Sequence, residues 1–195
     1  MDVGAFLKGF GTVDLLIVLY FLGFFVLGYA QGTIRRLIGI ASILFSWFLA
    51  ALVAEPLSNF LGANWTQFSK DYSYMVGFAT VFFASSIAFA LVVQSVYKPQ
   101  ALFSKARFAD EILGGILGLV QAAIIYGAVL IILDSFFRIP AVPVDPQELP
   151  FARAVWGALD GSQFTAIFRD TIIPVFFVLT GLFVPDKIKD AYPLS

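Results

Sequence analysis

The segment Ile112–Leu133, ILGGILGLVQAAIIYGAVLIIL, decides what kind of protein this chain is. It contains no charged residue, and Gln121 is its one amide side chain. An α-helix rises about 1.5 Å per residue, so roughly 20 apolar residues cross a hydrocarbon core ~30 Å thick. The segment therefore predicts a transmembrane helix.

Three earlier stretches have the same character, and they occupy residues 13–30, 37–54 and 74–97. Together with residues 112–133 they predict an all-α membrane protein with a four-helix transmembrane domain over residues 1–138. The first stretch also resembles a signal peptide, because Gly28-Tyr29-Ala30 offers a small-x-small cleavage site. The preceding residues are not basic overall, so we expect this helix to be retained.

The composition agrees with a lipid environment, since 60% of the 195 residues are hydrophobic and 13% are charged. The formal net charge of −1 offers no basic surface for nucleic acid. The chain has no Cys and no His, the residues that most often serve as nucleophile, general base and metal or haem ligand. We therefore expect no enzymatic activity, no metal site and no cofactor.

Basic residues near the spans predict the topology. Arg35 and Arg36 lie between the first two spans, and Lys98, Lys105 and Arg107 lie between the last two. The other side carries fewer basic residues, so the positive-inside rule places both of these loops in the cytoplasm. We expect a multi-pass membrane protein, with the N-terminus and the tail after the fourth span outside the cytoplasm.

The C-terminal region differs in pattern from the spans. Residues 139–150 predict a stiff linker, because proline recurs there and forbids a continued helix. Residues 151–195 predict an amphipathic segment at the membrane interface, divided into short pieces at Gly157 and Gly161. Residues 172–184 favour an interfacial or re-entrant piece, and a fifth span is the alternative.

Small residues mark two of the spans as packing partners. They recur at helical spacing at the end of the first span and the start of the fourth, at Gly28, Gly32, Gly114, Gly118 and Ala122. Glycines four residues apart share one helix face and let two backbones approach closely. We expect the first and fourth spans to pack antiparallel within one subunit, and a homodimer contact through the same residues is the alternative.

Buried polar residues are the other candidates. We expect Gln31 and Gln121 to hydrogen-bond the first span to the fourth, the alternative being that they line a polar path. Asp14, Asp110 and Asp134 stand at span ends, where carboxylates are costly and often functional. Asp110 suits a helix N-terminus, whereas Asp134 lies at a C-terminus and needs a partner, for which Arg138 is a candidate.

These features together resemble the colicin V production protein family (CvpA) of small bacterial inner-membrane proteins. The resemblance covers residues 13–138. It depends on Asp14 and the turn Gly32-Thr33-Ile34-Arg35, on Ala109-Asp110-x-x-Leu113-Gly114-x-x-x-Gly118, and on Leu133-Asp134-Ser135-Phe136. The family usually has Arg-Gly where this chain has Gln31-Gly32 and Gln121-Ala122. The resemblance implies a polytopic helical domain and a link to toxin production or export and to envelope stress.

Two classes of function fit these predictions. The first is an accessory or scaffold subunit that acts through helix–helix contacts with other membrane proteins or with itself, surrounded by membrane lipid. The second is a small oligomeric channel or transporter, for which the spans provide few polar residues.

Overall fold

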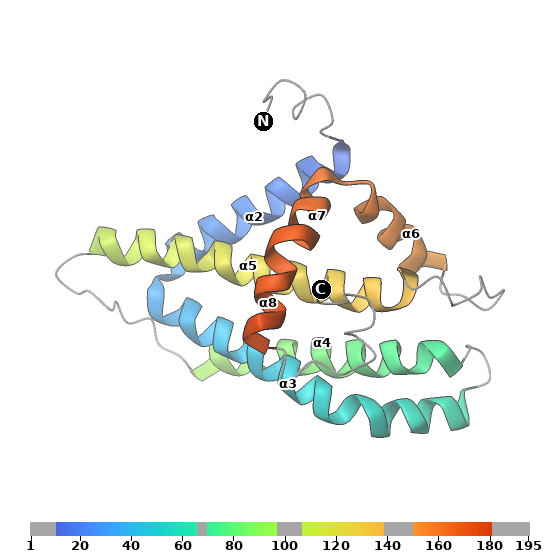
Figure 1. Ribbon diagram of the computed structural model, residues 1–195. Coiled ribbons are helices and arrows are strands. Elements are labelled where there is room, and N and C mark those ends of the chain that lie inside the picture. Colours follow the sequence, from blue (N-terminus) through green and yellow to red (C-terminus); the bar gives the residue numbers. More distant parts are fainter. Residues whose placement is uncertain (1–10, 66–69, 97–106, 139–149, 181–195) are drawn as a thin grey trace.

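The computed structural model describes residues 11–65, 70–96, 107–138 and 150–180. Every regular element in these ranges is helical, as the sequence predicts (Figure 1). The elements, in chain order, are α2 (Thr12–Gln31), α3 (Thr33–Asn64), α4 (Lys70–Val96), α5 (Arg107–Phe137), α6 (Pro150–Asp160), α7 (Gln163–Ile167), the π-helix η1 (Phe168–Ile172) and α8 (Ile173–Thr180). Most of the predicted linker and the residues after 180 lie outside the described ranges.

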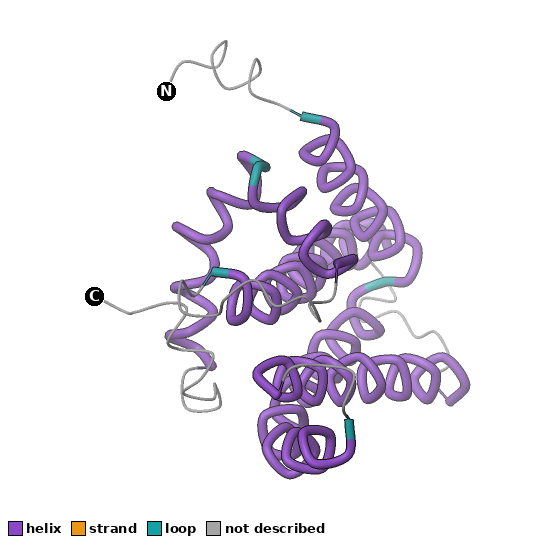
Figure 2. The backbone as a smooth tube through the Cα atoms, turned by 90° about the vertical axis from the view of Figure 1, so that its right-hand side faces the viewer, coloured by secondary structure: helices purple, strands orange, loops and turns teal. Residues whose placement is uncertain are grey.

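Four of these helices, α2 to α5, are long and apolar enough to cross a membrane. They form two tightly packed pairs, α2 with α5 and α3 with α4, and α3 also contacts α5. The C-terminal helices lie on one face of this bundle, in front in Figure 1 and at the left in Figure 2. The transmembrane prediction is therefore confirmed for all four spans.

The helices extend beyond the apolar stretches that predict them. The second stretch was expected to end at residue 54, but α3 continues through Pro56 to Asn64. A hydrogen bond of 3.1 Å between Ser58 and Ser73 joins this extension to α4. Hydropathy marks where the hydrocarbon core ends, whereas backbone hydrogen bonding continues into the polar zone.

The C-terminal segment is more regular than the sequence predicts. Gly157 lies inside α6 and does not divide the segment, while Gly161 follows the end of α6 as expected. The pieces α7, η1 and α8 then follow one another without a break and cross the bundle in front of α5 (Figure 1). The π-helix ends two residues before Pro174, which lacks a backbone N–H and clashes with the preceding turn of a regular α-helix.

Aromatic side chains make up much of the buried core. Trp47 of α3 is packed edge-on against Phe78 and Phe82 of α4 and against Phe176 of α8, with ring centroids 4.9, 5.8 and 5.4 Å away. Phe168 of η1 packs edge-on against Tyr126 of α5, at 4.9 Å. The helices η1 and α8 thus contribute side chains to the core.

Candidate functional site

The glycines predicted to pack lie at the crossing of α2 and α5. Gly28 is buried, and a Cβ atom added to it would overlap the carbonyl oxygen of Gly114. A Cβ on Gly118 would likewise overlap the carbonyl oxygen of Phe24. Ala122 is fully buried, and its carbonyl oxygen accepts a 3.1 Å hydrogen bond from Tyr20 of α2. These small residues therefore face each other within one chain.

Gly32 joins α2 to α3 and needs to be glycine for two reasons. Its φ of 76° lies in the left-handed region, and an added Cβ would lie 2.6 Å from Oδ2 of Asp110. The next residue, Thr33, donates a 3.1 Å hydrogen bond to the backbone carbonyl of Asp110. Asp110 is buried in the first turn of α5, so the sequence motif around it fixes the start of α5 against the α2–α3 turn.

Asp14 binds the C-terminal segment to the start of α2. Its side chain accepts hydrogen bonds from the backbone N–H of Gly11 (2.9 Å), the hydroxyl of Ser162 (2.7 Å) and the backbone N–H of Phe164 (3.0 Å). Asp14 is 1% exposed. Ser162 also caps α7 by accepting from the backbone N–H of Thr165. One carboxylate thus organises the N-termini of α2 and α7 together.

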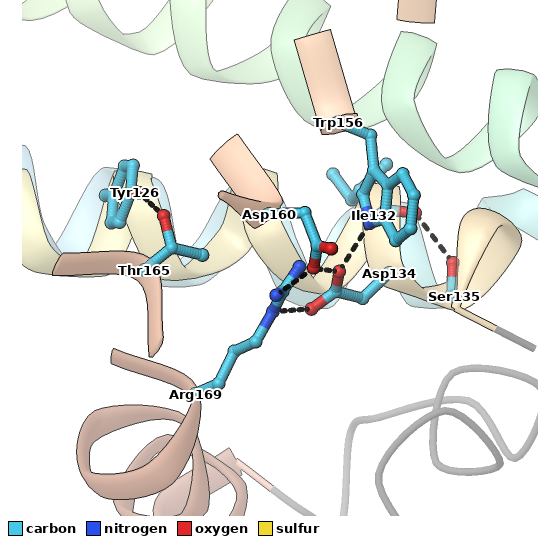
Figure 3. A network of polar contacts seen from close by, with 8 residues as sticks. All are labelled: Tyr126, Ile132, Asp134, Ser135, Trp156, Asp160, Thr165 and Arg169. Carbon is cyan, nitrogen blue, oxygen red and sulfur yellow. Dashed lines mark hydrogen bonds and ion pairs between the residues drawn. The ribbon is translucent and has the colours of Figure 1, made fainter. Parts of the chain in front are cut away.

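Asp134 forms a second, ionic attachment (Figure 3). Its carboxylate accepts two hydrogen bonds from Arg169 of η1, at 2.8 Å from Nε and 2.5 Å from Nη2. It also accepts a 2.8 Å bond from the indole N–H of Trp156 in α6. Arg169 reaches Asp160 of α6 as well, at 2.5 Å. We call Asp134, Arg169, Trp156 and Asp160 the Asp134 clamp.

A third contact lies between these two attachments. The hydroxyl groups of Tyr126 and Thr165 are 2.7 Å apart and both residues are buried (Figure 3). The C-terminal helices are therefore held by buried polar contacts at Asp14, Tyr126 and Asp134. Such contacts are strong where water is excluded and every member is satisfied.

A cavity of about 400 Å³, with both polar and apolar lining residues, lies between α2, α3, α4 and α5. Nη1 of Arg36 in α3 donates a 2.7 Å hydrogen bond to Oε1 of Gln121 in α5. Arg36 is 5% exposed, and its guanidinium lies 5.8 Å from the ring centroid of Phe24. The polar lining residues are Gln31, Arg35, Arg36, Ser42, Ser86, Gln94 and Gln121.

This cavity corrects the prediction for the two glutamines. Gln121 hydrogen-bonds to Arg36 of α3, so it joins the fourth span to the second and not to the first. Gln31 and Gln121 both line the cavity. The reason is that α2 and α5 approach too closely at their glycines to hold a long amide between them, so the glutamines lie to one side.

An apolar groove of about 340 Å³ separates α6 from α2 and α5. Its walls are Val13, Leu16, Ile17 and Tyr20 of α2, Tyr126 of α5, and Val155, Ala158 and Leu159 of α6. The Asp134 clamp binds Trp156 of α6, and Asp14 binds Ser162, which follows the end of α6. Both contacts help to place α6 next to the groove.

The contacts of two residues in these sites were not predicted from the sequence. Arg169 stands just before the stretch 172–184 that could form a fifth span, and Arg36 counted only as a topological charge. Leu113 of the motif is 39% exposed and lies outside the core. A signal for Arg169 did exist, since Asp134 needed a partner and Arg169 is a charge beside an apolar stretch. Nothing in the sequence distinguished it from Arg138.

No group of three or more acidic, cysteine or histidine side chains that could hold a metal occurs in the described parts of the chain. What the arrangement provides is a rigid helical body, a cationic cavity and an apolar groove. Four apolar spans with a clamped C-terminal segment define a multi-pass helical membrane protein.

The family model described as Colicin V production protein matches residues 13–182, and the chain belongs to this family. The match confirms the resemblance seen in the sequence and extends it from residue 138 through α6, α7, η1 and α8. No curated protein and no solved structure matches the chain significantly.

Proposed function

We propose that this protein is a non-enzymatic accessory subunit that binds a transmembrane helix of another membrane protein in the groove between α2 and α6. The observation that carries the proposal is that buried carboxylates hold the C-terminal segment, and α6 in this segment forms one wall of the apolar groove. Asp14 and Asp134, both almost fully buried, are bound by groups of the C-terminal segment. Buried ion pairs contribute little net stability but can specify one arrangement.

The groove has the chemistry that a partner helix needs. Its lining is apolar apart from two tyrosines, whose hydroxyls are hydrogen-bonded inside the chain to Ala122 and Thr165. Helix association in membranes depends on packing because lipid and protein are equally apolar, so a preformed groove favours a helix with complementary side chains. The G-x-x-x-G residues are already used between α2 and α5, so a partner helix would have to bind elsewhere.

Filling the groove tests this proposal. Ala158→Phe places an aromatic ring in the groove, whereas Ala154→Phe adds the same ring on an exposed part of α6 that does not line it. We expect the wild type and Ala154→Phe, purified from native membranes in mild detergent, to carry a second polypeptide at fixed stoichiometry in native mass spectra. Ala158→Phe should lose at least ~90% of it, since overpacking costs about 1–3 kcal/mol. Equal recovery of the second polypeptide with the wild type and both variants would refute the groove as the binding surface.

A channel or transporter is the second candidate, and the polar residues that line the cavity between α2, α3, α4 and α5 favour it. It would use Gln31, Gln121 and Arg36 as the lining of its path. A discrete homo-oligomer with no foreign subunit in the same spectra, together with ion or solute flux in vesicles, would favour this candidate over the first.

We also propose that the protein lies in the bacterial inner membrane with the start of α2 outside and the start of α5 in the cytoplasm. The chain has no cysteine, so single cysteines report position cleanly. A membrane-impermeant maleimide should label Thr12→Cys in intact spheroplasts and should label Phe108→Cys only after lysis. Both residues are exposed in the structure. The reverse pattern would invert the topology.

A further inference from the structure

We propose that the cavity between α2, α3, α4 and α5 binds the phosphate group of an anionic membrane amphiphile through Arg36 and Arg35. This site shares none of its lining residues with the groove. The inference is therefore independent of the proposed accessory role and goes beyond it.

The cavity carries a positive charge that the described residues do not balance. Arg35 and Arg36 line it, and none of its lining residues in the described ranges is acidic. The hydrogen-bond partner of Arg36 is the neutral amide of Gln121, at 2.7 Å. A guanidinium inside a membrane protein normally has an anionic partner because its desolvation is costly. A bound anion would supply that partner.

The cavity also contains donors without acceptors. Nε of Arg36 is buried and has no hydrogen-bond partner, although Arg36 as a whole is 5% exposed. The hydroxyl of Ser86, on the α4 wall of the same cavity, is likewise buried without a partner. The planar guanidinium fork suits the paired oxygens of a phosphate group, and a hydroxyl can donate to a third oxygen.

The remaining wall of the cavity indicates an amphiphile. Leu27, Phe83 and Ile87 line the cavity and are also 50%, 42% and 59% exposed. They therefore open the cavity sideways, toward the acyl chains of the surrounding membrane. A headgroup phosphate at Arg36, with its acyl chain along Leu27 and Ile87, would occupy both the cationic part and the apolar part of the cavity. Basic pockets between transmembrane helices on the cytoplasmic side bind anionic headgroups in this way.

The test uses the full-length chain in detergent, titrated with phosphatidylglycerol or with phosphatidylcholine of the same acyl chains, and read by native mass spectrometry. We expect the wild type to bind one phosphatidylglycerol at least tenfold more tightly than phosphatidylcholine. Arg36→Gln removes the charge and retains an amide beside Gln121, and it should weaken binding about tenfold or more. Arg107→Gln, at a side chain that is 87% exposed on α5, should leave binding unchanged.

A second variant keeps the test informative if Arg36→Gln does not fold. Ser86→Phe fills the cavity from α4 while both arginines remain, and it should also abolish selective binding. Displacement of the lipid by excess inorganic phosphate, with the same dependence on Arg36, would overturn the amphiphile as the source and assign the phosphate site to a soluble anion. Equal binding of both lipids, or equal binding by Arg36→Gln and Arg107→Gln, would overturn the site itself.

Discussion

We expect Asp134→Ala to loosen the attachment of the C-terminal helices to the four-span domain. The carboxylate of Asp134 is fully buried and accepts two hydrogen bonds from Arg169, whose side chain is 9% exposed. Its removal leaves the guanidinium with Asp160, a partner that is 46% exposed. Breaking a buried pair from one side costs about 3–5 kcal/mol. Amide hydrogen exchange in η1 and α8 should therefore accelerate by about two to four orders of magnitude.

Two further variants serve as controls for this prediction. Glu111→Ala breaks the ion pair with Arg107, which lies on the surface and should contribute about 0.5 kcal/mol or less. The double variant Asp134→Leu, Arg169→Met replaces the buried pair by apolar groups of similar size. It should restore slow exchange, since such replacements are often neutral or stabilising. If Asp134→Ala exchanged no faster than Glu111→Ala, the clamp would not hold the C-terminal segment.

Gly28→Ala separates α2 from α5. The added methyl group would overlap the carbonyl of Gly114, and a helical backbone cannot rotate aside as a side chain can. Overpacking of this kind costs about 1–3 kcal/mol, and more where backbones must move apart. The free energy of unfolding, measured in mixed detergent micelles, should fall by that amount, and Gly118→Ala should behave in the same way.

Gly23→Ala is the matched control on the same helix. A Cβ at Gly23 has no atom within 4 Å among the described residues, so the substitution adds no clash. Alanine favours a helix over glycine by up to about 1 kcal/mol, so the variant should be neutral or slightly more stable. Equal losses at Gly23 and Gly28 would mean that helix propensity, and not the α2–α5 contact, governs stability.

The four spans were predictable because a span depends on local composition. Twenty or so apolar residues in a row have few alternatives to a transmembrane helix, and this holds for Thr12–Gln31 as for Arg107–Phe137. Helix ends were predicted less well, as the continuation of α3 past Pro56 shows. Polar residues end an apolar stretch without ending the hydrogen-bonded helix.

The glycines and carboxylates could be selected from sequence, but most of their partners could not. Asp14 and Asp134 attracted attention because charge near a membrane core is costly. Their partners Ser162 and Arg169 lie 148 and 35 residues away, brought close only by the return of the C-terminal segment across the bundle. No local pattern encodes that return.

The sequence also does not predict which of the two adjacent residues Arg35 and Arg36 is buried. Adjacent in sequence, they contribute equally to a count of topological charges. In a helix, successive side chains point about 100° apart. Arg36 is therefore directed to Gln121 and becomes buried, while Arg35 remains half-buried at the edge of the same cavity. The rotation of α3 that decides between them is set by its packing against α4 and α5.

Photo-crosslinking in native membranes tests the accessory-subunit account most directly, because no detergent can remove or create the partner. A benzophenone amino acid at position 158 faces the groove, and the same probe at position 154 lies on α6 outside it. The account predicts one crosslinked product from position 158 that contains a different membrane protein, and little or none from position 154. Crosslinks from position 158 to lipid alone, or to a second copy of this chain, would contradict it.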